Sequence, residues 1–165
     1  MRTYFVLALA AAFVLASPVL GQQGTGDTEL QLQGNLFLGG SGQEDSGSVA
    51  VQVGRFLTEY QEIGLGVIGT IQGDSKFAGS GGPYYRYNFS AGKTVPYLGA
   101  SAGTTFSNFR GAGTSTVATA EGGVRFFLDR KTAFTVGATK TYFFKQKEFD
   151  KGLNIQFGFS HLWGK

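Results

Sequence analysis

The sequence of 165 residues has no cysteine, only 3 prolines and a single histidine. Without cysteine the chain can form neither disulfides nor thiolate metal sites. The single histidine lacks the partners of defined geometry that a metal site or a catalytic arrangement needs. Charged residues make up 15% of the chain, which is low for a soluble domain. The formal net charge of +3 is too small to indicate a nucleic-acid partner, and we expect no cofactor, no metal and no enzymatic activity.

Glycine and aromatic residues are abundant instead. There are 27 glycines, and aromatic residues make up 15% of the chain, a composition that suits the wall of a β-barrel. After the N-terminal region no apolar run is long enough to cross a membrane as a helix. A membrane form of this protein would therefore cross with strands.

The N-terminal residues 1–21 have the pattern of a secretory signal peptide. One positive charge precedes an apolar run from Tyr4 to Ala16, and a small residue stands at Gly21. A membrane anchor or a buried helix is the alternative, but the run is shorter than the about 20 residues that span a bilayer. We expect cleavage after Gly21, with Ala16 or Gln22 as other possible positions. A flexible leader of residues 22–28 and one domain of residues 29–165 follow.

Eight segments of this domain alternate between apolar and polar residues with period two, as strands with two different faces do. The expected strands are residues 29–39, 48–57, 62–71, 83–89, 95–104, 115–128, 133–144 and 153–163. Short connectors alternate with longer polar loops, which is the layout of bacterial outer-membrane barrels. The sequence therefore predicts an all-β fold, an eight-stranded antiparallel up-and-down transmembrane β-barrel with its apolar face outward.

Aromatic residues gather near the expected strand ends, which predicts two girdles at the membrane interfaces. The girdle at the short connectors would contain Phe56, Tyr60, Phe89, Tyr97, Phe126, Phe134 and Trp163. The girdle at the long loops would contain Phe37, Tyr84, Phe106, Tyr142, Phe143 and Phe144.

Two segments resemble strands of a known family. Residues 95–103 read VPYLGASAG and residues 122–129 read GGVRFFLD, and both are similar to strands of the small outer-membrane β-barrels that include the OmpA transmembrane domain and OmpX. Members of this family usually end on an aromatic residue that the barrel-assembly machinery reads. The corresponding pattern here is Gln156, Gly158, His161 and Trp163, followed by two further residues. The resemblance implies a porin-like barrel in a Gram-negative cell envelope, surrounded by outer-membrane lipid and lipopolysaccharide.

Charged residues form the first candidate site. Their positions in the alternation place them on the inward face of their strands, which we call inward parity. Arg86, Glu121 and Arg125 share that parity on two strands that flank a third, and Gln33 and Asn35 extend the polar interior. This cluster has two interpretations, a gated solute path or a filled, hydrogen-bonded plug. The plug is favoured because an eight-stranded barrel has room only for its own side chains. Inward glycines such as Gly64, Gly66, Gly99 and Gly123 keep a wetted passage open as an alternative.

The remaining motifs give weaker indications of a binding or catalytic site. Residues 64–69 match a dinucleotide-binding spelling, but the helix that this motif requires cannot start after them, so the glycines are better explained by packing inside a barrel. His161 lies beside Ser160, yet adjacent strand residues point to opposite faces and cannot act together. Lys140 shares the lipid-facing parity, which requires either a side chain that reaches the rim or a bulge. Possible contact anchors in or beside the loops are Phe77, Phe106, Phe109 and Phe149.

The leading functional hypothesis is an integral outer-membrane barrel with a structural or surface-interaction role and no catalysis. A narrow pore for small solutes is the alternative. A lipid-modifying barrel enzyme and a soluble periplasmic ligand-binding barrel, which would turn its apolar face inward, are the remaining possibilities. The sequence does not identify a surface ligand.

Overall fold

The computed structural model describes residues 23–38, 46–72, 76–107, 114–145, 148–149 and 153–164. The long strands are β1 (Thr28–Leu38), β2 (Ser46–Phe56), β3 (Gln61–Gln72), β4 (Lys76–Asn88), β5 (Thr94–Ser107), β6 (Thr116–Phe127), β7 (Thr132–Phe143) and β9 (Leu153–Trp163). A two-residue strand, β8 (Glu148–Phe149), pairs antiparallel with the last residues of β7. Within the described residues, no helix is long and apolar enough to cross a membrane.

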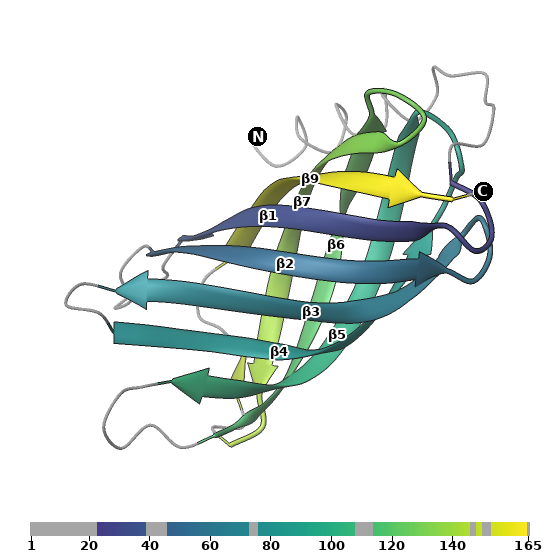
Figure 1. Cartoon of the computed structure of the whole chain (residues 1–165). Helices are drawn as coiled ribbons and strands as arrows, with labels where there is room; N and C mark the ends of the chain where they lie inside the picture. The colour runs from purple at the N-terminus through teal and green to yellow at the C-terminus, as the bar shows by residue number, and fades with distance from the viewer. Residues whose placement is uncertain are drawn as a thin grey trace, which may run out of the picture.

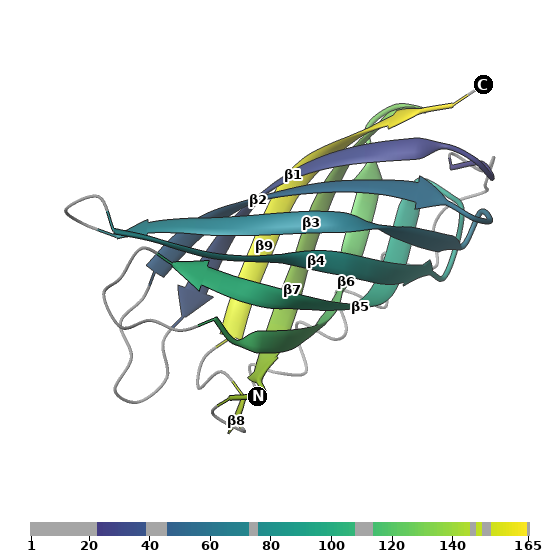
Figure 2. The ribbon, with the colours of Figure 1, turned by 60° about the horizontal axis from the view of Figure 1, so that its bottom comes forward.

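The long strands close into a ring (Figures 1 and 2). Each strand from β1 to β7 pairs antiparallel with the next, β7 pairs with β9, and β9 returns to β1. The closing pair is in register from Thr28 opposite Trp163 to Leu38 opposite Leu153. Closure leaves no open sheet edge among the long strands. The predicted eight-stranded antiparallel barrel is confirmed.

The two ends of the barrel differ. Residues 57–60, 89–93 and 128–131 connect strands at one end, which we call the short-turn end. The opposite end, which we call the loop end, carries the longer connections after β1, β5 and β7, but the β3–β4 connection there spans only residues 73–75, so the expected long loop at that place is wrong. β4 begins at Lys76 and not at residue 83. Its first half contains Gly79, Gly81 and Gly82, which give no apolar alternation, and pairing with β3 and β5 supplies the strand instead.

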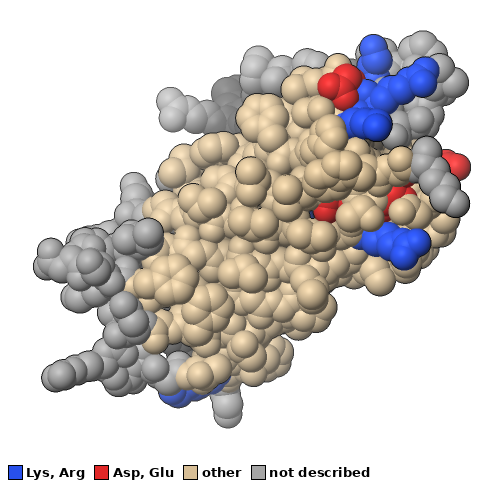
Figure 3. Space-filling model, in the orientation of Figure 1, with Lys and Arg blue, Asp and Glu red and all other residues tan. Residues whose placement is uncertain are grey.

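The apolar face of the wall points outward. Leu65 is 66% exposed and Leu98 is 58% exposed, whereas Gln31 and Arg86 are fully buried. Most of the wall seen in Figure 3 carries no charged side chain, and the charged groups gather mainly toward the short-turn end. A soluble ligand-binding barrel would have the opposite arrangement, with its apolar side chains inside.

The predicted girdles are partly wrong. Phe56, Tyr84 and Tyr97 are buried inside the barrel, and Phe143 lines an internal cavity. These residues have inward parity, which overrides the general preference of aromatic residues for the membrane interfaces. The girdle residues with clearly exposed rings are Tyr60, Phe89, Phe106, Phe144 and Trp163.

The first described residues, 23–27, are hydrogen-bonded to the short-turn end. Gln23 is buried, and its Nε2 donates to the carbonyl oxygens of Glu59 at 2.7 Å and Ser90 at 3.3 Å. The backbone N–H of Gly26 donates to the Phe56 carbonyl at 2.8 Å. Residues 23–27 are therefore bonded to two short turns and to the end of β2, and the flexibility of residues 22–28 stays a prediction. The expected signal peptide, residues 1–21, lies outside the described residues.

Lys140 lies in a regular part of the sheet. The β6–β7 ladder runs without interruption from Val117 opposite Phe143 to Phe127 opposite Ala133, and Lys140 pairs with Ala120. The alternative of a bulge is therefore wrong. Lys140 keeps its outward parity three residues before β7 ends at the loop end.

Candidate functional site

The lumen is organised in layers, and the layer at the short-turn end is apolar. Its members come from the ends of five strands near the short turns, and all are buried. They are Phe56, Val95, Phe127, Ala133 and Leu162. This layer occupies the lumen at this end, and residues 23–27 are bonded to the neighbouring turns.

Above the apolar layer lies a group of five ionic side chains, which we call the charge cluster: Glu29, Glu62, Arg86, Glu121 and Arg125. Glu62 Oε2 joins the two arginines, at 3.1 Å from Arg86 Nη1 and 3.0 Å from Arg125 Nη2. Arg125 Nη2 also contacts Glu29 Oε2 at 2.8 Å, and Arg86 Nε contacts Glu121 Oε1 at 3.0 Å. Each side chain is at most 8% exposed. Water is therefore largely excluded from these ion pairs.

Aromatic and amide side chains complete the surroundings of the arginines. The Arg86 guanidinium lies 4.9 Å from the Tyr97 ring centroid and 5.1 Å from that of Tyr84, which is cation–π geometry. The Tyr84 hydroxyl donates to Glu62 Oε1 at 2.5 Å. Arg86 Nη2 donates to Gln52 Oε1 at 2.8 Å, and Gln156 Nε2 donates to the Tyr97 hydroxyl at 2.7 Å. These bonds hold each Arg86 nitrogen in a fixed direction.

Inward glycines make the space that this cluster occupies. A Cβ at Gly64 would collide with the Val53 carbonyl oxygen and the Tyr84 ring, and one at Gly99 would collide with the Glu121 side chain. The space beside Gly123 is taken by the Tyr97 hydroxyl, and the space beside Gly66 by the Gln52 side chain. The glycines that suggested a wetted passage therefore accommodate large polar side chains from neighbouring strands. Residues 64–69 lie within β3, which continues to Gln72, so no helix follows the dinucleotide-like spelling.

The predicted interior residues separate into two groups. Arg86, Glu121 and Arg125 all belong to the charge cluster, and Glu121 contacts Arg86. Gln33 and Asn35 are buried and point into the lumen nearer the loop end. They are not in contact with the arginines in the described hydrogen bonds and ion pairs.

Sequence reasoning missed two central members of the cluster, Glu29 and Glu62. Each was the first residue of an expected strand and was treated as a boundary. Strand parity gave the signal that could have found them, because Glu29 shares a face with Gln31 and Glu62 shares a face with Gly64. The register also pairs Glu62 directly with Arg86.

The loop-end half of the lumen holds a cavity of about 490 Å³, which we call the outer cavity. Its walls carry mainly glycine, serine, threonine and carboxamide side chains. Tyr84, Glu121 and Gln156 lie at its inner end, where it meets the charge cluster. The hydroxyls of Thr119 and Thr141 lie 3.0 Å apart on its wall.

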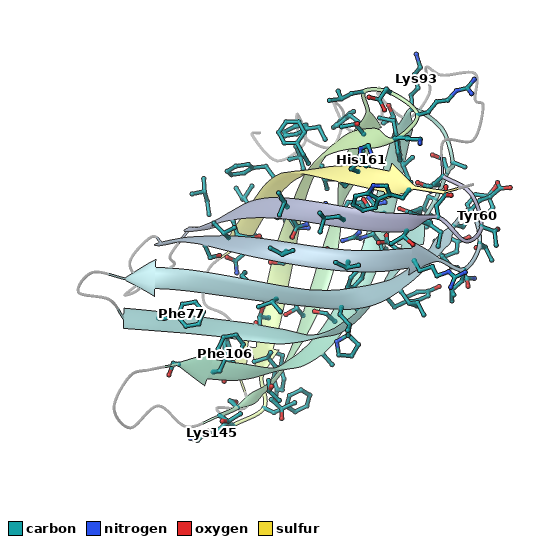
Figure 4. The ribbon with its side chains drawn as sticks, in the orientation of Figure 1. Tyr60, Phe77, Lys93, Phe106, Lys145 and His161 are labelled. Carbon is teal, nitrogen blue, oxygen red and sulfur yellow. The ribbon has the colours of Figure 1, made fainter. Side chains whose placement is uncertain are left out.

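The C-terminal strand places its predicted residues on both faces. Gln156 and Gly158 face the lumen, and the outward rings of His161 and Trp163 meet edge to face with centroids 5.1 Å apart (Figure 4). Ser160 is buried, whereas His161 is exposed. The two residues therefore point to opposite faces, as their adjacency predicts.

The expected loop contacts are only partly loop residues. Phe77 lies in β4 and Phe106 in β5, and their rings pack 5.7 Å apart on the outer wall near the loop end (Figure 4). Phe149 belongs to β8 and pairs with Tyr142. Phe109 lies outside the described residues. Phe77 and Phe106 are thus part of the outward apolar face, because both strands extend further than alternation predicted.

No protein-family model matches this sequence, and no curated protein does. Solved structures nevertheless share its fold. The N-terminal β-barrel domain of OprF from Pseudomonas aeruginosa matches with a TM-score of 0.64 and 17% identity, over 84% of this chain and 99% of that one. OprG, an outer-membrane protein of the same species, matches with a TM-score of 0.60 and 10% identity over 88% of this chain and all of its own (100%).

Neisserial surface protein A matches with a TM-score of 0.59 and 13% identity, over 82% of this chain and 94% of that one. At such low identity the likeness concerns the fold alone. This chain has the fold of small outer-membrane β-barrels, in agreement with the resemblance of its strands.

Proposed function

We propose that this protein is exported by its N-terminal signal, spans the bacterial outer membrane and serves a structural or surface-interaction role with a plugged lumen and no catalysis. The outward apolar wall supports residence in lipid, because a soluble barrel would expose that wall to water at a large cost. Release of the protein from membranes by carbonate would contradict this part of the proposal.

The charge cluster is the observation that carries the plugged interior. Two arginines and three glutamates, each side chain at most 8% exposed, cross the lumen from the four strands β1, β3, β4 and β6. The apolar layer lies between them and the short-turn end. An ion moving through the barrel would have to displace charge-assisted bonds that are not screened by water.

A narrow solute pore remains the second candidate, favoured by a specific set of polar atoms. Buried atoms without a hydrogen-bond partner in the described structure include Arg125 Nε, both amide atoms of Gln31, Thr135 Oγ1 and Ser160 Oγ. They lie on the neighbouring strands β6, β7, β9 and β1. Groups of this kind usually bond to water, so a hydrated path would open on this side of the lumen, where these atoms have almost no accessible surface in the structure.

Planar-bilayer recording of the purified protein separates the two candidates. For a plugged barrel we expect no large steady conductance from the unmodified protein. In Glu121→Ala, Arg86 loses its partner at 3.0 Å, and we expect brief openings because one side of the plug is weakened. Thr119→Ala is the matched control, since it shortens an inward side chain two residues away on the same strand and leaves the ion pairs intact.

Sustained ion-selective current through the unmodified protein would move the function to transport. Equal opening frequencies in Glu121→Ala and Thr119→Ala would show that the charge cluster is not the barrier.

A further inference from the structure

The outer cavity contains buried donors that have no partner. Gln33 and Asn35 are 3% and 4% exposed, yet Gln33 Nε2 and Asn35 Nδ2 have no hydrogen-bond partner in the described structure. Both residues line the cavity. A buried donor left unpaired is costly, and such groups are rare in folded proteins. These two amides therefore point to an acceptor on the cavity side, and because neither nitrogen has more than a trace of accessible surface, their side chains must turn toward the cavity to reach it.

The register of the sheet gathers further carboxamides around these two. Asn35 pairs with Gln156 across β9 and with Ser48 across β2. The carboxamides lining the cavity from β1, β2 and β9 form what we call the amide wall: Gln33, Asn35, Gln52, Asn154 and Gln156. Hydroxyl-bearing side chains of β4, β5 and β6 line the cavity as well, among them Ser80, Ser101 and Thr119. A solute in the cavity would meet both hydrogen-bond donors and acceptors.

The charge of the cavity selects the kind of solute. Among the described residues that line it there is no lysine or arginine, and the only carboxylate is Glu121, which is paired with Arg86. A charged solute would therefore be buried without a counter-charge, which is costly. An apolar solute would leave the amides of Gln33 and Asn35 unpaired. The volume of about 490 Å³ lies within the range of small-ligand sites.

We propose that the outer cavity binds a small neutral polyhydroxylated solute of the monosaccharide class. Oxygen atoms of the solute accept hydrogen bonds from Gln33 Nε2 and Asn35 Nδ2, and its hydroxyls donate to the oxygens of the amide wall. Tyr84, at the inner end of the cavity, offers part of its ring and limits how deep the solute enters. Binding does not require passage, so this site is compatible with a plugged lumen and its test is independent of conduction.

Nuclear magnetic resonance of the isotope-labelled protein can detect this binding directly. The detergent must carry no sugar headgroup, since an alkyl glycoside would compete for the site. Methyl α-D-glucopyranoside serves as the probe. Glucose 6-phosphate, a sugar with a charge, and cyclohexane, a six-membered ring without hydroxyls, are the two comparison compounds. We expect saturable shifts of the side-chain NH2 signals of Gln33 and Asn35 with the neutral glycoside and none with the other two.

Variants assign the signals to the site. Asn35→Leu should weaken binding about tenfold, which corresponds to about 1.4 kcal/mol, and Gln33→Leu provides the same test if Asn35→Leu does not fold. Gln31→Leu is the matched control: Gln31 is inward on the same strand and fully buried, but it does not line the cavity. Its amide has no partner in the described structure, so its loss should leave both folding and binding unchanged.

Three results would overturn the proposal. They are shifts that grow linearly to the highest glycoside concentration, equal weakening by Asn35→Leu and Gln31→Leu, and stronger binding of the phosphorylated sugar than of the neutral one.

Discussion

The two halves of the lumen are built from the same strands but by different means. Toward the short-turn end, the strands carry large or charged inward residues, and glycines on neighbouring strands give them room. Toward the loop end, the same strands carry small neutral residues, and a cavity of about 490 Å³ remains. Because the wall is common to both halves, the difference lies only in the inward side chains. A barrel can thus combine a rigid half with a receptive half without any change of fold.

The comparison predicts that stability is concentrated in the half that contains the charge cluster. Glu62→Ala should lower the free energy of unfolding by about 3–5 kcal/mol, because it leaves two buried arginines without a shared partner. The matched change in the other half, Thr119→Ala, removes one neutral hydroxyl pair at 3.0 Å and should cost about 1 kcal/mol. Urea titration followed by the fluorescence of Trp163, the single tryptophan, measures both. Similar losses in the two variants would mean that the two halves contribute equally.

A smaller effect is expected from two inward glycines that lie two residues apart on β3. A Cβ at Gly64 meets the backbone of β2 and the Tyr84 ring, whereas one at Gly66 meets the flexible Gln52 side chain at 3.1 Å. Gly64→Ala should therefore lower the free energy of unfolding by about 1–3 kcal/mol through overpacking. Gly66→Ala should lower it clearly less, because Gln52 can shift toward the cavity. The same urea titration distinguishes them. A larger loss for Gly66→Ala would contradict the difference in packing between the halves.

The outward face of both halves was predictable from the sequence, but the inside only in part: alternation placed Arg86, Glu121 and Arg125 inside and missed Glu62. Residues such as Leu65 and Val67 alternate with glycine, so period two is evident without knowledge of neighbouring strands. The role of Glu62 is evident only from its ion pairs with Arg86 on β4 and Arg125 on β6. The cluster depends on ring closure, which brings together residues distant in sequence, and local alternation carries no information on those partners.

The wrong girdle assignment has the same physical origin. Tyr84 and Tyr97 were assigned to girdles by residue type, although their parity placed them inside, and the burial of their rings against Arg86 is a tertiary contact. Gln23 bonds to turns 36 and 67 residues away in the chain, which no local pattern can predict. The strands were predicted correctly because the alternation that reveals them is a local property of the sequence. The contents of the lumen are determined by contacts between strands.

The smallest effect is expected at a short turn outside the lumen. Asp129 Oδ1 accepts hydrogen bonds from the backbone N–H groups of Lys131 at 2.7 Å and Thr132 at 2.8 Å, and these bonds hold the pKa of the exposed Asp129 carboxyl below its ordinary value. Asp129→Asn keeps an acceptor oxygen and should change stability less than Asp129→Ala, and both changes should be smaller than that of Gly64→Ala.

Because the folded-state pKa of Asp129 is lowered, its charge contributes stability above the ordinary pKa, and this contribution is lost as pH falls through the folded value. The unfolding midpoints of the protein and of Asp129→Asn should therefore converge as pH falls through that range. If Asp129→Ala destabilised the barrel as much as Glu62→Ala does, the stability of this half would depend on its turns as much as on the charge cluster that they enclose.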